Sequence, residues 1–194
     1  MDATSNPGAT ALQVKVTLLG VSKPPVWRRL LVADEEGLDH LHAVIQLSMG
    51  WSDYHMHVFA TEAGEYGVPD PELGFLDERR VALLQLLRHP GDRIRYTYDF
   101  GDAWEHEIVL EKMIDADPGQ VYPMCVAGKG ACPPEDCGSV WGYARLRAVL
   151  ADPSDEEHSS MLEWLELERA SDFDAAAFDV DAVNESLGHL IAVR

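Results

Sequence analysis

The chain has 194 residues, enough for one or two domains, and its 46% hydrophobic and 25% charged residues are ordinary for a folded globular protein. It carries 34 Asp and Glu residues against 15 Lys and Arg residues, a formal net charge of −19, which opposes binding to polyanionic DNA. It contains no run of about 18 apolar residues and no basic, then apolar, N-terminal stretch, so it predicts neither a membrane span nor a secretory signal. Three cysteines are too few for a disulfide framework, and we expect a cytoplasmic protein with reduced thiols.

The first half of the chain shows strand patterns around one amphipathic helix. Residues 1–11 are small and polar, which predicts a disordered N-terminus. Apolar and polar residues alternate in LQVKVTLLG from residue 12 and in VWRRLLV at 26–32, which predicts two strands. Apolar residues at helical spacing predict a helix over 38–49 that ends at Gly50. A strand and turn at 55–67, a loop at 68–80 and a short helix at 81–87 follow.

The second half begins with the clearest hairpin pattern and ends in helical patterns. DRIRYTYDF (92–100) and WEHEIVLEKMI (104–114) predict two strands joined by a tight antiparallel turn. Residues 115–137 contain four prolines, three glycines and all three cysteines, which predicts an irregular segment. Apolar spacings of three and four residues predict helices over 140–152, 156–168 and 179–191.

These elements predict an α+β fold in a single domain covering residues 12–194. Its sheet is mostly antiparallel and occupies the first two-thirds, with the amphipathic helix after the second strand, and its last third is helical. The helical part, about 140–191, is acidic: between Asp152 and Asp181 there are 11 acidic residues and one basic residue. This surface is solvated or binds a basic partner. The pairs Arg28–Arg29, Arg79–Arg80 and Arg93/Arg95 are candidates for a nucleic-acid patch, but such pairs are more often solvated ends of strands and helices.

Cysteines form the first candidate metal site. Cys125, Cys132 and Cys137 have the spacing C-x6-C-x4-C, and His106 on the preceding strand offers a fourth zinc ligand. This spacing lacks the C-x2-C pair of zinc ribbons, and the alternative is that the cysteines pack a Pro/Gly-rich loop against the sheet.

Histidines form the second candidate. His55 and His57 are two residues apart on a predicted strand, where alternation places both imidazoles on one face, and His42 on the preceding helix offers a third ligand. Zinc or another divalent ion is the cofactor that such a set would bind. Histidine pairs at strand ends are also common as plain surface residues.

The predicted hairpin turn YDFGDAWEH is the third candidate. Asp99, Asp102 and His106 lie close together in sequence around the turn, and converging side chains of these types bind a divalent ion or act as acid and base. The plainer interpretation is that both aspartates accept backbone hydrogen bonds within the turn. The chain contains no G-x-S-x-G, Walker, G-x-G-x-x-G or H-E-x-x-H motif.

The sequence resembles the plasmid pRiA4b ORF-3-like family. The resemblance is carried by YTYDFGDAWEHEIVLEK, by YPMCVAGKGACPPEDCGSVWGY and by LDHLHAVIQLSMGWSDYHMHVF, and it extends over about residues 12–190. Ser139 stands where the family often has a second glycine after PEDCG. The resemblance implies a single α+β domain without an established activity. Members also carry the label of an insertion-element passenger protein, TnpR, which implies association with plasmids and mobile elements.

Two functions follow from these observations. A non-enzymatic binding or interaction module is favoured by the absence of catalytic motifs and by the uneven charge, with a basic protein or other ligand as its partner. The alternative is a metal-dependent hydrolase that uses a His/Asp site. A functional serine resolvase is not expected, because the acidic chain shows neither a nucleophilic serine among catalytic arginines nor a basic helix-turn-helix.

Overall fold

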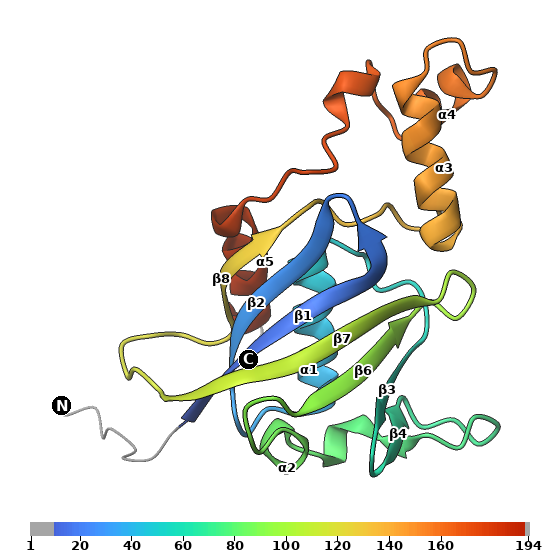
Figure 1. The fold of residues 1–194 in the computed structure, drawn as a ribbon. Coiled ribbons are helices and arrows are strands. Elements are labelled where there is room, and N and C mark those ends of the chain that lie inside the picture. The colour runs from blue at the N-terminus through green and yellow to red at the C-terminus, as the bar shows by residue number, and fades with distance from the viewer. Residues whose placement is uncertain (1–9, 193–194) are drawn as a thin grey trace.

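One large β-sheet organises the chain in the computed structural model, which describes residues 10–192 (Figure 1). The strands, in chain order, are β1 (Thr10–Ser22), β2 (Pro25–Ala33), β3 (His57–Thr61), β4 (Gly64–Gly67), β5 (Leu76–Asp77), β6 (Arg93–Tyr98), β7 (Trp104–Asp115) and β8 (Met124–Lys129). In the sheet their order is β5-β4-β3-β6-β7-β1-β2-β8. Every neighbouring pair is antiparallel except β4 and β5, which confirms the predicted, mostly antiparallel sheet.

The described residues also form five α-helices and two short 3₁₀ helices. They are α1 (Leu38–Met49), α2 (Leu83–Leu86), α3 (Ser139–Ala151), α4 (His158–Trp164), α5 (Val180–Ala192), η1 (Glu78–Arg80) and η2 (Ala170–Asp172). None of these helices combines the length and apolar composition that crossing a bilayer requires. The last third of the chain is less helical than predicted, because turns and η2 occupy most of the stretch between α4 and α5.

Alternation of buried residues explains the central strands. On β1 the side chains of Leu12, Val14, Val16 and Leu18 are buried, two residues apart, as a strand with one face on the core requires. The predicted hairpin forms as β6 and β7, which pair from Arg93 opposite Val109 to Tyr98 opposite Trp104.

Helix α1 covers one face of the sheet and fills the core (Figure 1). Its apolar stripe, which includes Leu38, Leu41, Val44 and Ile45, is fully buried. The helix ends where expected, since Gly50 adopts the left-handed region at φ 90° and its N–H donates to the carbonyl of Gln46. Helix α5 packs beside α1 and holds β8, because the side chain of Asn184 bonds both the N–H and the carbonyl of Cys125.

The N-terminal segment and the segment 115–137 also differ from their predictions. Of the N-terminal segment 1–11, expected to be disordered, residues 1–9 lie outside the described residues, and Thr10 and Ala11 begin β1. The segment 115–137, expected to be irregular, contains β8, which pairs with β2 from Met124 to Lys129. Its sequence MCVAGK has no alternating pattern, so its strand structure depends on this long-range pairing with β2.

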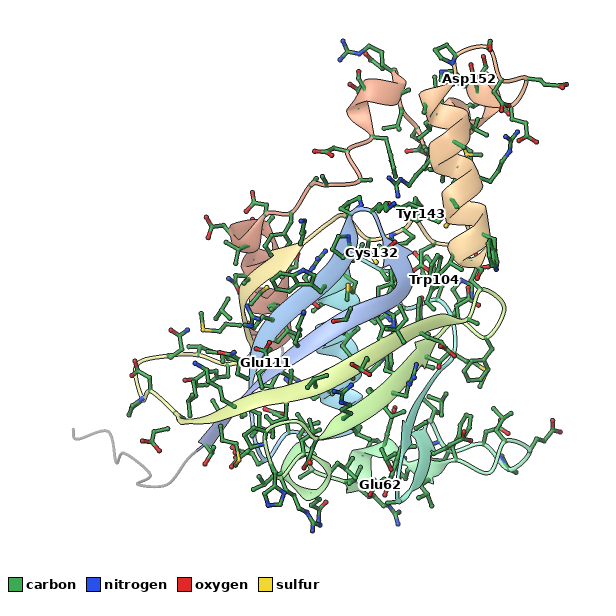
Figure 2. All side chains as sticks on the ribbon, in the orientation of Figure 1. Glu62, Trp104, Glu111, Cys132, Tyr143 and Asp152 are labelled. Carbon is green, nitrogen blue, oxygen red and sulfur yellow. The ribbon has the colours of Figure 1, made fainter. Side chains whose placement is uncertain are left out.

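Helices α3 and α4 form an arm that stands away from the sheet (Figure 1). None of the seven residues of α4 is buried, whereas α3 buries Tyr143 and Leu146. Tyr143 lies at the base of the arm, in the same region as Cys132, at the end of the sheet (Figure 2). The arm therefore begins directly beside the loops at that end of the sheet.

Candidate functional site

His55 lies at the centre of a cluster formed by three separate loops. Its Nε2 is 3.1 Å from Oδ1 of Asp136, 3.8 Å from Oδ2 of Asp99 and 3.9 Å from Oε2 of Glu135. His55 belongs to the segment between α1 and β3, Asp99 directly follows β6, and the two other acids lie between β8 and α3. We call these four residues the His55 cluster.

In Asp99 and Glu135 of the His55 cluster, one carboxylate oxygen accepts hydrogen bonds and the other lies nearest His55. Oδ1 of Asp99 accepts from the N–H of Gly101, and Oε1 of Glu135 accepts from the N–H of Ser52 and from the hydroxyl of Tyr98. Their second oxygens, Oδ2 and Oε2, are the ones nearest His55. Hydrogen bonds that fix one oxygen and orient the other are the usual outer partners of metal-ligating carboxylates.

The converging atoms are not satisfied by one another. Nε2 of His55 and Oε2 of Glu135 are buried and have no hydrogen-bond partner, and the 3.1 Å approach of Asp136 to His55 lacks hydrogen-bond geometry. The ligand-type atoms of His55, Asp99 and Asp136 all lie within 4.8 Å of one another. Ligands about 2.0–2.4 Å from a shared divalent ion stand about 3–4.5 Å apart. The spacing therefore suits a metal ion better than it suits direct pairing.

This region has unusual backbone angles at two aspartates and raised pKa values at two neighbouring side chains. Asp99 and Asp136 adopt left-handed backbone with φ of 55° and 54°, a conformation that concentrates at functional sites when non-glycine residues hold it. Burial, with the neighbouring Glu135 carboxylate, raises the pKa of Tyr98 well above its usual range. Burial, with the charge of Asp102, raises the pKa of Cys137 to about 12. Both groups are therefore neutral at pH 7.

A second cluster lies beneath α1 and contains the other predicted histidines. The rings of His42 and His57 are stacked at 3.5 Å and are 8° from parallel. Nε2 of His42 donates to Asp53 at 2.8 Å, and Nε2 of His57 donates to Glu78 at 2.7 Å. Burial and the neighbouring His57 lower the pKa of His42, so its Nδ1 accepts from the hydroxyl of Tyr96.

This stacked pair is less suited to one ion than the His55 cluster. Two imidazoles bound to one tetrahedral ion at about 2.0–2.1 Å have ring centres about 5 Å apart. The rings of His42 and His57 are 3.5 Å apart and both Nε2 atoms already have carboxylate partners, although the ligand atoms of His42, Asp53 and His57 lie within 4.8 Å of one another. Metal binding would require the rings to separate.

The sequence-predicted residues are distributed over several environments. His55 and Asp99 come together, whereas His57 joins His42. Asp102 accepts from the N–H of Gly138 at the start of α3, and His106 is fully buried with its Nδ1 donating to the carbonyl of Trp104. Within residues 10–192, neither Asp102 nor His106 joins a group of three converging ligand atoms.

The cysteines are likewise separate from both clusters. Cys125, Cys132 and Cys137 are free thiols, and in the part of the chain that the structure describes none of them belongs to a converging group of ligand atoms. Burial raises the pKa of all three thiols. Their packing fits the loop-filling interpretation of this segment.

The arginine pairs have partners in the fold. Arg28 is buried and donates to the carbonyls of Ser48, Lys129 and Gly130, and Arg29 forms an ion pair with Glu111. Arg79 and Arg80 both form ion pairs with Asp77. Arg93 pairs with Glu107, and Arg95 pairs with Glu105.

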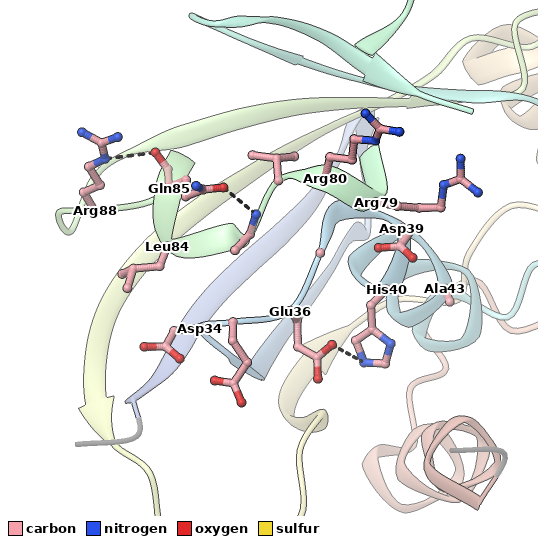
Figure 3. Close-up of a pocket in the computed structure, with 14 residues that line it drawn as sticks. Asp34, Glu36, Asp39, His40, Ala43, Arg79, Arg80, Leu84, Gln85 and Arg88 are labelled. Carbon is pink, nitrogen blue, oxygen red and sulfur yellow. Dashed lines mark hydrogen bonds and ion pairs between the residues drawn. The ribbon is translucent and has the colours of Figure 1, made fainter. Parts of the chain in front are cut away.

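A large open cleft lies elsewhere, between the start of α1 and the η1–α2 segment (Figure 3). Its volume is about 1010 Å³, with acidic side chains such as Asp34 and Asp39 on one wall and Arg79, Arg80 and Arg88 on the other. Arg79 and Arg80 both pair with Asp77, and Arg88 bonds the carbonyl of Gln85. Neither histidine cluster contributes a lining residue.

Sequence reasoning missed Glu135 and Asp136, which complete the His55 cluster, and Asp53 and Glu78, which flank the stacked pair. Glu135 and Asp136 stand in the motif PPEDCG. Their position between two prolines and the start of a helix is the one feature of the sequence that indicates an ordered loop there.

Comparison with known proteins agrees with the fold and the motifs. The profile of the plasmid pRiA4b ORF-3-like family matches residues 10–182. The chain belongs to this family. It is 40% identical over 187 residues to the uncharacterized protein y4hQ of Sinorhizobium fredii strain NGR234, covering 95% of this chain and 94% of y4hQ. It is also similar to the crystal structure of a protein of unknown function, MM3350 from Methanosarcina mazei Go1, with a TM-score of 0.78, 34% identity, and coverage of 89% of this chain and 97% of MM3350.

Proposed function

We propose that this member of the pRiA4b ORF-3-like family is a metal-dependent hydrolase whose divalent ion is bound by His55, Asp99 and Asp136, with Glu135 beside them. The observation that carries the proposal is that Nε2 of His55, which is buried and makes no hydrogen bond, lies 3.1–3.9 Å from three carboxylate oxygens. The alternative, a plain surface histidine in ion-pair contact with acidic residues, leaves Nε2 of His55 and Oε2 of Glu135 buried without a hydrogen bond.

The ligand set indicates which ion and which chemistry fit. One imidazole nitrogen with two carboxylate oxygens suits Mn²⁺ or Zn²⁺ better than the all-oxygen preference of Mg²⁺ or Ca²⁺. Three protein ligands would leave room for water on the ion, and the ion would lower the pKa of that water toward neutrality. Asp136 is 68% exposed at its side chain, so the solvent side of the cluster is the side on which a substrate enters.

The test is metal binding by isothermal titration calorimetry with matched variants. Asp99→Asn keeps an oxygen for the Gly101 N–H but removes a charged ligand, and we expect Mn²⁺ and Zn²⁺ affinity to fall at least about 100-fold, because the loss of a ligand exceeds the 10–100-fold effect of losing an outer partner. Asp53→Asn makes the same change beside His42, and Cys125→Ser removes a thiol. Both variants should bind the ion as the wild type does.

Three results decide the matter. Stoichiometric binding that Asp99→Asn weakens, together with metal-dependent hydrolysis that the same variant abolishes, supports the proposal. Binding that is lost only in Asp53→Asn would move the ion to the stacked pair and refute this site. A wild-type protein that binds neither ion refutes the function as a whole.

A second candidate function, a non-enzymatic binding module, rests on the arm formed by α3 and α4. Trp141 is 82% exposed and Trp164 is 47% exposed, and the segment that follows is strongly acidic. Exposed aromatic residues beside acidic ones suit a basic partner. Binding of such a partner would persist in Asp99→Asn and fall in Trp141→Ala, which is the reverse of the pattern expected for the hydrolase.

A further inference from the structure

A cavity between α3 and α4 opens beside the His55 cluster. Its volume is about 350 Å³, within the range of small-ligand pockets, and Asp136 is one of its lining residues. Asp136 also approaches His55 at 3.1 Å, so one side chain belongs to both the cluster and the cavity wall. Cys137, the next residue, lines the cavity as well.

The cavity has an apolar wall and a polar wall on which the charge of Arg145 is balanced by neighbouring carboxylates. Cys137, Leu146, Met161 and Trp164 provide the apolar surface. Arg145, on the polar side, pairs with Asp155 at 2.9 Å and with Glu157 at 2.8 Å, so it offers no free positive charge to a ligand.

Helix α4 leaves its side of this apolar wall without a partner. It has no buried residue, and Trp164 remains 47% exposed although it faces the cavity. Exposed tryptophan beside a concave site is typical of ligand contact, because a large flat side chain gains most from covering apolar surface.

The charge of the cluster limits what can occupy the cavity. Asp99, Glu135 and Asp136 carry three negative charges, so the cluster with one divalent ion bound would keep a net charge of about −1. The chain as a whole carries −19. Repulsion therefore disfavours phosphate or carboxylate groups at this position and favours an uncharged, apolar group.

We infer that the cavity is a substrate subsite for an aryl or branched aliphatic group, and that the substrate class is uncharged esters or amides of such groups. This inference rests on the proposed function. In the reaction, water adds across the acyl bond: its hydroxyl goes to the carbonyl carbon and its proton goes to the departing oxygen or nitrogen, so no further reactant is needed. The apolar group in the cavity places the carbonyl carbon beside Asp136 and the ion.

The experiment compares two probes that share one chelating group. Benzohydroxamate and acetohydroxamate bind metal in the same way but differ in the aryl group, so their affinity ratio on the Mn²⁺-loaded protein reports the cavity alone. We expect benzohydroxamate to bind at least about tenfold more tightly. Trp164→Ala and Met161→Ala should bring the ratio close to one without changing Mn²⁺ affinity.

Trp141→Ala is the matched control, because Trp141 is exposed but does not line the cavity. It should keep the wild-type ratio. Equal affinity for the two probes on a protein that binds Mn²⁺ overturns the subsite and leaves the metal site standing, as does a wild-type ratio in both cavity variants. Failure of the wild type to bind Mn²⁺ overturns the proposed function itself.

Discussion

Replacement of His106 by leucine should remove a large part of the acid sensitivity of the fold. His106 is fully buried beside Tyr96 and Trp51, and its Nε2 has no hydrogen-bond partner. Burial lowers its pKa from the ordinary value of 6.5 to about 4. Because the unfolded chain binds the proton more readily, stability is complete above pH 6.5 and falls as the pH drops toward 4.

The magnitude follows from the two pKa values. The full loss corresponds to about 3 kcal/mol, of which about 2 kcal/mol is already lost at pH 5. Urea unfolding, followed by tryptophan fluorescence at pH 7.5 and pH 5, measures the difference. His106→Leu should be less destabilised by the drop in pH than the wild type, by about 2 kcal/mol.

His189→Leu is the control, since it removes an exposed imidazole from α5 and should keep the wild-type response. Equal losses between pH 7.5 and pH 5 in the wild type and in His106→Leu would refute the reasoning, because they would mean that His106 binds its proton equally well in both states.

Two further predictions concern the buried hydroxyl of Tyr143 and the three cysteine thiols. The hydroxyl of Tyr143 is buried without a hydrogen-bond partner, so Tyr143→Phe should leave the free energy of unfolding unchanged or raise it by up to about 1 kcal/mol; a loss larger than this would contradict the structure. Burial raises the pKa of all three cysteine thiols, so the folded protein should react slowly with Ellman's reagent at pH 7.5 and release three equivalents in denaturant; a fast-reacting thiol in the folded state would count against this packing.

Sequence patterns within a short stretch of chain predicted the β6–β7 hairpin and helix α1 correctly, because neighbouring residues determine these elements. The β6–β7 hairpin follows from two alternating runs around a short turn, and α1 ends at Gly50 because that residue adopts a left-handed φ. The predicted helix over 156–168 is shorter in the structure, where α4 ends at Trp164 and Glu166 takes a φ of 55° that a helix cannot contain. Strand β8 could not be predicted, because its pairing with β2 lies about a hundred residues away in sequence.

The candidate site was predicted only in parts, for a related reason. Strand alternation predicts that His55 and His57 share one face, but β3 begins at His57, so alternation does not determine where His55 points. Asp99 was grouped with its neighbours in the hairpin turn, and its convergence with His55 depends on the pairing of β3 with β6. The loop before α3 supplies the remaining acids, and nothing in its sequence specifies which end of the sheet it reaches.

The His55 cluster combines these segments in a way that makes a bound ion structurally useful. The carboxylates of Asp99 and Asp136 lie close together and repel one another, and a divalent ion would convert that repulsion into attraction among the loop after α1, the β6–β7 turn and the loop after β8. Helix α3 starts three residues after Asp136, and Gly138 is already held by Asp102. An ion at the cluster would therefore fix the base of the arm against the sheet. The cavity between α3 and α4 would then keep a constant position relative to the metal, as an active site requires.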